Sequence, residues 1–219
     1  MNPFLLLQLA DSAFPTGAFA HSAGLEAARA LGEVDGPEAL ERYARAALWN
    51  AGTLALPFVA AAHREPSRLA DLDARCDAVL ASQVANRASR AQGQALLRAA
   101  GAALGGEVAA LAERARGERL AGHLSPVHGA VLRLAGADLA EAERLFLSGT
   151  LRGLVAAAVR LGVSGPMEGQ ALQARLAVEA ERVAEACGGR EPEEAAASDP
   201  LVDLFQMHQD RLYSRLFQS

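Results

Sequence analysis

The 219-residue chain is long enough for one sizeable hydrophobic core, and 51 of its residues are alanine. β-Branched and aromatic residues are scarce, so the composition favours helices over sheets. All 21 basic residues are arginine, and the absence of lysine excludes a Walker phosphate lysine and Schiff-base chemistry. The net charge of −5, with acidic and basic residues interspersed, excludes a basic stripe for nucleic-acid binding.

The cysteines and the apolar runs indicate the cellular compartment of the protein. Cys76 and Cys187 stand alone, without Cys-x-x-Cys spacing and without a secretory signal ahead of them. The longest apolar runs, such as Leu154–Val159, are too short to span a bilayer. We therefore expect a cytoplasmic protein with reduced core thiols, no targeting segment and no membrane partner.

The first third of the chain predicts a series of short helices. Asn2 followed by Pro3 is a helix-start signal, and we expect a helix over 3–10. The turn Phe14-Pro15-Thr16-Gly17 leads into a second helix that ends near Leu31. Asp35 and Glu38 resemble a capping box that opens a third helix, and Pro57 and Pro66 bracket a fourth.

The middle of the chain predicts longer helices. From Ser67 onward, apolar residues recur at steps of three and four residues, as in an amphipathic helix. Two further helices are expected over 87–101 and 107–116, followed by a loop over 117–126. Asp138 and Glu141 form a second capping box before a long apolar segment, 139–161, which we expect to lie deepest in the core.

The C-terminal part predicts one more helix, a linker and a tail. After a helix over 167–187, the stretch Gly188–Ala197 has the composition of a linker, and Asp199-Pro200 restarts a helix. The residues expected to share one face of this helix are Leu201, Leu204, Phe205, His208 and Leu212. The sequence thus predicts an all-α bundle of roughly eight to ten helices, divided into residues 1–187 (the helical domain), 188–199 (a flexible linker) and 200–219 (a partner-binding C-terminal helix and tail).

No stretch of the sequence has the pattern of a catalytic or metal site. There is no Gly-x-Ser-x-Gly, His-Glu-x-x-His or glycine-rich phosphate motif. Of the five histidines only His123 and His128 are close in sequence, and a stable metal site needs three or four converging ligands. We therefore expect no catalytic residue, no bound metal and no cofactor.

The tail is unusual because four bulky apolar residues, the first of them Leu212, lie within its last eight positions. Tyr213, Leu216 and Phe217 lie there with Arg215 between them, whereas chain ends are usually polar and frayed. Either the tail folds back onto the core or it inserts into another protein. Composition slightly favours the fold-back.

Both ends of the chain resemble one family. LLQLADSAFPTGAFAHSAGLE, Leu6 to Glu26, is similar to the N-terminal signature of the urease accessory protein UreF family. HQDRLYSRLFQS, from His208 to Ser219, resembles that family's ending, and RAQG from Arg90 and VAAAVRL from Val155 resemble internal segments. The sequence departs from the family pattern at His21, often Tyr, at Gln218, often Arg, and in 162–170, which lacks the usual Pro-Leu-Gly.

The resemblance implies a non-catalytic factor in the maturation of the nickel enzyme urease. The expected protein is an all-helical homodimer that binds the accessory protein UreD (UreH in some systems). Through that complex it is expected to recruit and regulate the GTPase UreG at apo-urease, where nickel is inserted. The missing lysines fit a protein that regulates another chain's GTPase.

The resemblance also implies a partner-binding surface at the two ends of the chain. The residues expected to form or border the surface for UreD/UreH are Phe19, His21, Tyr213, Arg215, Leu216 and Phe217. The turn of the family motif consists of Pro15, Gly17, Ser22, Gly24 and Glu26. Two alternatives stay open: a nickel carrier that binds metal through His123, His128 or a histidine shared between copies, and a small helical enzyme or ligand-binding protein.

Overall fold

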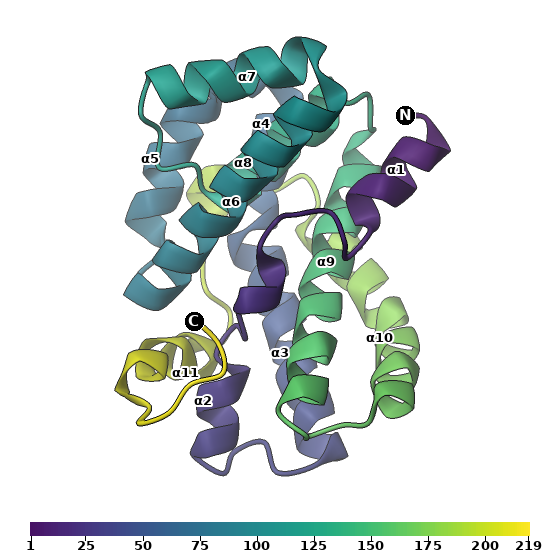
Figure 1. Ribbon diagram of the computed structural model, residues 1–219, viewed down its shortest axis with the longest axis vertical. Helices are drawn as coiled ribbons and strands as arrows, with labels where there is room; N and C mark the ends of the chain where they lie inside the picture. The colour runs from purple at the N-terminus through teal and green to yellow at the C-terminus, as the bar shows by residue number, and fades with distance from the viewer.

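The computed structural model describes residues 1–219, and the predicted all-α class is confirmed, since the fold contains no strand (Figure 1). The α-helices are α1 (Pro3–Ala10), α2 (Leu25–Ala30), α3 (Pro37–Leu54), α4 (Leu56–Arg64), α5 (Leu69–Val79), α6 (Gln83–Leu104), α7 (Gly106–Gly117), α8 (Leu124–Leu134), α9 (Leu139–Arg160), α10 (Pro166–Cys187) and α11 (Pro200–His208). The 3-10 helices are η1 (Ala18–Ala20), η2 (Pro66–Arg68), η3 (Pro192–Glu194) and η4 (Gln209–Arg211).

Three of the four predicted helix starts are as expected, including Asp199 and Pro200 at the start of α11. Asn2 caps α1 by accepting a hydrogen bond from the amide of Phe4 at 2.9 Å. Asp138 and Glu141 form the predicted reciprocal capping box of α9. The capping box expected at Asp35 is wrong, because Pro37 takes the first helical position and Gly36, which has no side chain to bond, is the N-cap of α3.

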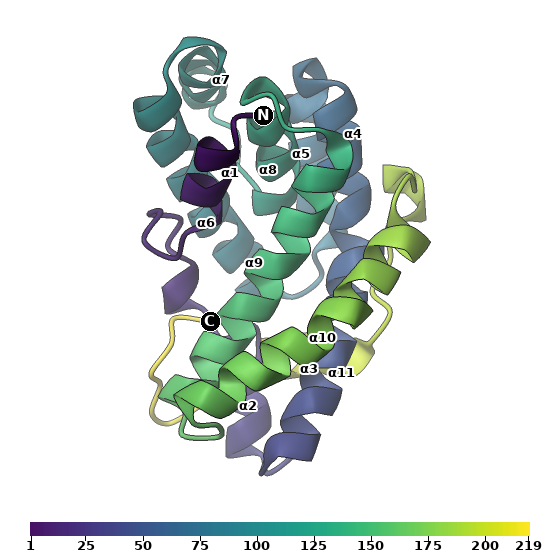
Figure 2. The same ribbon diagram turned by 90° about the vertical axis from the view of Figure 1, so that its right-hand side faces the viewer.

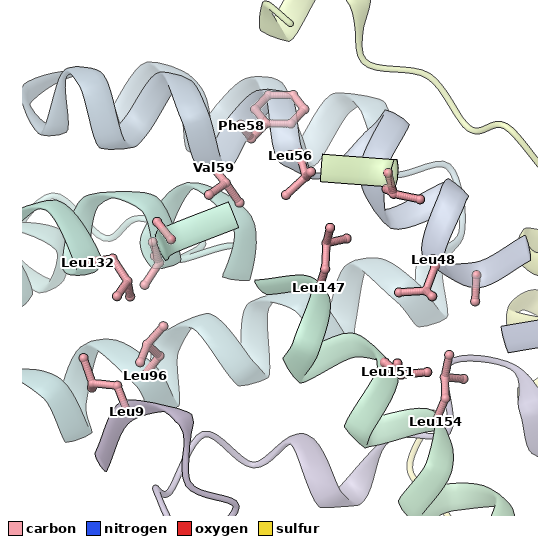
Figure 3. Packing of buried hydrophobic residues seen from close by; sticks show 14 of the residues in the cluster. Leu9, Leu48, Leu56, Phe58, Val59, Leu96, Leu132, Leu147, Leu151 and Leu154 are labelled. Carbon is pink, nitrogen blue, oxygen red and sulfur yellow. The ribbon is translucent and has the colours of Figure 1, made fainter. Parts of the chain in front are cut away.

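The centre of the core is the pair α4 and α8, which share the most extensive contact in the fold. All residues of 56–63 and of 125–132 are buried. Gly129 allows this approach, since a Cβ there would lie 2.1 Å from the carbonyl oxygen of Val59. In Figure 3, Leu56, Phe58 and Val59 of α4 lie at the top with Leu132 of α8 below them, and Leu147, Leu151 and Leu154 of α9 lie below and to the right of Leu56.

The segment expected deepest in the core, 139–161, lies instead at its side. Helix α9 buries one face, including Leu147, Leu151 and Leu154, and exposes residues such as Arg144 on the other. Helix α10 packs along α9, and the two lie side by side at the front of Figure 2. They form an outer layer of the bundle.

Helix α8 corrects the prediction of a loop over 117–126. The helix begins at Leu124 and contains Pro126 in its first turn, where the missing amide proton breaks no hydrogen bond. Because α8 is buried on all sides, its sequence lacks the alternation of apolar and polar residues that marks a helix at the surface. The loop itself ends at His123.

The predicted division into domain, linker and tail stays a prediction. In the structure, residues 188–199 include η3 and lie against α3 and α4. The amide of Ala196 donates to the carbonyl oxygen of Thr53 at 3.2 Å, and the amide of Ser198 donates to Asn50 Oδ1 at 3.0 Å. These contacts carry the chain from α10 to α11. None of the helices combines the length and the apolar character that crossing a membrane requires.

Candidate functional site

The two ends of the chain meet in the structure. After α1 the chain crosses the bundle toward α2, and its C-terminal end lies beside this segment in both views (Figures 1 and 2). The amide of Gln218 donates to the carbonyl oxygen of Ala20 at 2.8 Å, and the amide of Ser22 donates to the backbone oxygen of Ser219 at 2.5 Å. The hydroxyl of Ser22 donates to the same oxygen at 3.1 Å, and His21 Nδ1 lies 2.5 Å from Ser219 Oγ.

The carboxylate of Glu26 binds the tail through hydrogen bonds to its backbone amides. Glu26 is only 6% exposed, at the start of α2. Its Oε1 accepts the amide of Leu216 at 2.6 Å, and its Oε2 accepts the amide of Phe217 at 3.2 Å and Gln209 Nε2 at 2.5 Å. Such charge-assisted bonds to a buried carboxylate are among the stronger hydrogen bonds in proteins.

Arg160, at the end of α9, holds the tail from the other side. Its guanidinium donates to the carbonyl oxygen of Phe19 at 2.8 Å and to that of Leu216 at 3.3 Å. It also lies over the rings of Phe217 and Phe19, 4.3 and 5.4 Å from their centroids. We call Ser22, Glu26 and Arg160, together with residues 216–219, the terminal clasp.

The turn residues of the motif give the N-terminal half of the clasp its shape. Gly17 has a φ of +72° and precedes η1, and Gly24 has a φ of +85° and precedes α2. A Cβ on Gly24 would lie 2.8 Å from Tyr43 Oη and 2.9 Å from the amide nitrogen of Gln206. Gly24 therefore lets α3 and α11 approach the chain. Pro15 follows the buried Phe14 in the turn.

The residues expected to bind a partner divide into an exposed and a buried set. Phe19, Leu216 and Tyr213 are 61%, 59% and 107% exposed. Phe217 is buried under Arg160, and His21 is half-buried, which lowers its pKa. Arg215 pairs with Asp210 at 3.0 Å, and Asp210 also pairs with Arg87 of α6.

Helix α11 adds exposed apolar residues that the sequence analysis did not single out as exposed. Its inner residues are Val202, Phe205 and, beyond its end, Gln209; its outward residues are Leu201, Leu204 and Met207. The prediction that Leu201, Leu204 and Phe205 share one face is therefore wrong, because Phe205 points inward and the two leucines point outward. Apolar residues occupy both faces, so spacing alone does not decide between them. The chain also leaves helical geometry after η4, and the tail is irregular.

A groove lies between the N-terminal turn and the outer helices α9 and α10. Its volume is about 860 Å³, and its lining includes Phe19, Arg152, Arg160 and Met167. The guanidinium of Arg152 donates to the carbonyl oxygen of Ala10, which attaches the end of α1 to α9. The groove is open and borders the clasp through Phe19 and Arg160.

His123 and Cys76 are engaged in structural contacts inside the fold. His123 has no exposed side-chain surface; its Nε2 lies 3.0 Å from Asp77 Oδ1 and its Nδ1 3.1 Å from Ser89 Oγ. Although this order of residues resembles a hydrolytic triad, Ser89 Oγ accepts the amide of Leu124 and no substrate can reach the ring. Burial raises the pKa of the Cys76 thiol to about 12, which disfavours the reactive thiolate.

The histidines considered as nickel ligands are bound within the protein. His128 is buried, and its Nε2 lies 3.0 Å from the carbonyl oxygen of Ala142. His63, also buried, makes the same kind of contact with Ala137 at 3.0 Å. The structure contains no group of three or more histidine, cysteine, aspartate or glutamate side chains placed to hold a metal ion.

Fold and site together define an all-helical protein whose two ends join, with exposed apolar and aromatic side chains beside the junction. The model of the UreF family matches residues 34–177, which is more than half of the chain. The chain belongs to the UreF family. The matched range does not include the two terminal segments, residues 6–26 and 208–219, that resemble the family.

The curated relatives span both ends. Urease accessory protein F of Arabidopsis thaliana is 40% identical over 218 residues, 97% of this chain and 90% of that protein. The protein of the same name from Oryza sativa subsp. indica is 38% identical over 216 residues, 96% and 82% of the two chains. Urease accessory protein UreF of Mycobacterium tuberculosis (strain ATCC 25618 / H37Rv) is 35% identical over 216 residues, 95% of each chain.

Proposed function

We propose that the protein is a non-catalytic scaffold in urease maturation, which binds UreD/UreH and through it recruits and regulates the GTPase UreG at apo-urease for nickel insertion. The observation that carries this proposal is the set of exposed apolar side chains in α11 and the tail. Five of the twelve large hydrophobic residues exposed in the fold lie between positions 201 and 216. Phe19 lies next to the tail across Arg160.

The chemistry of this surface suits a protein partner. Protein interfaces are enriched in aromatic residues and arginine, and a few well-packed side chains provide most of the binding free energy. Tyr213 and Leu216 are the exposed side chains of the tail that fit this role, and Arg215 lies between them. Phe217, His21 and the buried parts of the clasp act in this proposal as anchors that border the surface.

The chemistry of the rest of the chain supports a role without catalysis. The chain has no lysine for phosphate binding, and Cys76 and His123 are buried in structural contacts. A scaffold that assembles other proteins requires surface complementarity and no reactive group. The same proposal includes a cytoplasmic location and a homodimer.

The test compares two changes of the surface with a matched control. Deletion of Tyr213–Ser219, and separately the double substitution Tyr213→Ala and Leu216→Ala, are expected to abolish or strongly reduce co-purification with UreD. Phe4→Ala with Leu7→Ala removes two exposed apolar residues of α1 and is expected to leave binding unchanged. Circular dichroism should show unchanged helicity in each variant. Undiminished binding by both tail variants would refute the proposal.

A second measurement separates the scaffold from a nickel carrier. Equilibrium dialysis of the isolated protein with Ni²⁺ is expected to show no stoichiometric binding near neutral pH, because His123 and His128 are committed to contacts inside the fold. Tight binding of one ion per chain that is lost in His123→Gln or His128→Gln would favour the carrier instead.

A further inference from the structure

We propose that Glu26 and Arg160 are positioning residues for the partner-binding surface: they hold the terminal clasp closed, and in doing so fix Tyr213 and Leu216 in the arrangement that a partner protein binds. The inference rests on the proposed function. It assigns to Glu26 a role separate from any direct contact with the partner, since its side chain is buried and faces the tail.

The tail depends on outside groups for its conformation. Beyond Arg211 it has no regular secondary structure. From Leu216 onward its side chains alternate between exposed and buried, with Leu216 and Gln218 outside and Phe217 and Ser219 inside. An extended segment of this kind leaves its backbone amides free to bond with other parts of the protein. The groups that bind those amides and carbonyls therefore decide where the exposed side chains lie.

Glu26 binds the backbone of the two residues at which the tail changes from an exposed to a buried side chain. Its two oxygens accept the amides of Leu216 and Phe217, the first residue pointing outward and the next inward. Its Oε2 also accepts Gln209 Nε2, so the same carboxylate connects the tail to the end of α11. All three partners are donors, and a neutral amide in place of the carboxylate would set a donor against at least one of them.

Arg160 closes the clasp from α9. The guanidinium donates to carbonyl oxygens on both ends of the chain, those of Phe19 and Leu216, and covers the ring of Phe217. Its planar shape allows stacking and two hydrogen bonds at once, which a lysine ammonium cannot provide. Arg160 therefore fixes Leu216 and Phe19 relative to one another.

A residue bonded to the clasp, Gln209, favours its opening. Gln209 is fully buried, and its Oε1 has no hydrogen-bond partner although its Nε2 has two. An unsatisfied buried acceptor opposes the closed state. If only the closed clasp binds the partner, the apparent affinity decreases by the fraction of molecules that are open. Weakening Glu26 or Arg160 is then expected to weaken binding without changing any residue of the contact surface.

The experiment uses Glu26→Gln, which keeps the size of the side chain, and Glu33→Gln as a control for the same loss of charge at an exposed residue. Binding to UreD is measured by titration, and amide exchange is followed by mass spectrometry. Glu26→Gln is expected to raise the Kd at least 10-fold and to speed exchange in peptides covering 212–219, while peptides from α4 and α8 stay protected. Glu33→Gln should behave as the unchanged protein.

Two further variants keep the result interpretable. Arg160→Lys retains the charge and is expected to give a smaller effect in the same direction, which serves as the second variant if Glu26→Gln does not fold. In a background of Leu216→Ala, Glu26→Gln is expected to raise the Kd by a smaller factor than in the unchanged protein. A general structural role would give the same factor in both backgrounds and would overturn the inference.

The outcomes for this inference and for the proposed function differ. If the tail variants lose UreD binding and neither Glu26→Gln nor Arg160→Lys alters it, the positioning role is wrong and the scaffold function stands. If the tail variants bind UreD as the unchanged protein does, the proposed function fails and this inference fails with it.

Discussion

Single residues in this fold are constrained by what lies next to their backbone. Gly24 is the most constrained residue of the N-terminal motif, because it combines a positive φ with two close neighbours, Tyr43 and the backbone of Gln206. Ala23, beside it, also has a positive φ, and its carbonyl oxygen accepts the hydroxyl of Tyr43 at 2.7 Å. This short segment fixes how α2, α3 and α11 meet.

Gly24→Ala is expected to destabilise the protein by about 2 kcal/mol or more, since a left-handed backbone disfavours any side chain and the new methyl group would contact the amide of Gln206. Urea unfolding followed by circular dichroism measures the change. Gly149→Ala in α9 is the control, because nothing lies within 4 Å of the added Cβ, and it should be neutral or slightly stabilising. Equal stability of the two variants would contradict the account.

Buried His128 is expected to make the protein acid-sensitive. Burial lowers its pKa to about 4, whereas the unfolded chain titrates near 6.5, so the folded state binds fewer protons between these values. Stability is therefore complete above pH 6.5 and decreases as the pH falls toward 4, by about 3 kcal/mol for this residue. The lowered pKa of neighbouring buried His63 adds a loss in the same direction.

Unfolding free energies measured from pH 7.5 to 4.5 test this expectation. His128→Gln retains a donor for the carbonyl of Ala142 and cannot titrate, so it should show a shallower loss of stability in acid than the unchanged protein. Identical slopes for the two proteins would show that His128 does not carry the effect.

At the scale of helices, the sequence predicts those that have an apolar face or a capping signal: the prediction of α1 rests on Asn2 and Pro3, that of α5 on its apolar spacing, and that of α9 on its capping box. It does not predict α8, whose surroundings are apolar on every side.

The loop before α8 is fixed by a residue distant in sequence. Asp73 of α5 is buried and accepts the amides of Gly122 at 3.1 Å and of His123 at 2.7 Å. No local pattern reveals this pairing.

Asp73→Asn is expected to cost about 2 kcal/mol, because the amide group sets a donor against one of the two backbone amides and leaves it unsatisfied in the interior. Asp71→Asn, two residues earlier on the same helix, removes only exposed ion pairs with Arg68 and Arg75 and should change the melting temperature little. Thermal unfolding of both variants decides the matter. Comparable destabilisation by Asp71→Asn would contradict the anchoring role of Asp73.

At the scale of the molecule, composition predicts the all-helical class, and the resemblance at both ends predicts the family. The sequence does not predict that those two ends meet in the fold. The sequence leaves the fold-back of the tail and its insertion into a partner as alternatives, whereas in the structure Phe217 folds back and Tyr213 stays exposed. Glu26 and the amides it binds are 190 residues apart, and no short-range pattern reports such a contact.

The proposed homodimer belongs to this scale as well. The outer layer of α9 and α10 exposes Met167 and Val178, which are 82% and 63% accessible, and we expect two copies to associate there. Light scattering at micromolar concentration should give twice the 22.8 kDa chain mass. Val178→Glu should shift the protein toward the monomer, whereas Leu31→Glu, exposed on α2, should not. A monomer at all concentrations would remove this proposal.

The joined ends also set an order of events during synthesis. The ribosome synthesises Ser219 197 residues after Ser22, so the hydrogen bonds between the tail and residues 20–22 can form only after the intervening helices have been made. Closing so long a loop is entropically unfavourable, and the contact is expected to form after the helices have packed. A nascent chain therefore passes through a stage in which residues 20–26 lack the hydrogen bonds of the tail and are accessible to chaperones, and products truncated before Leu216 remain in that state.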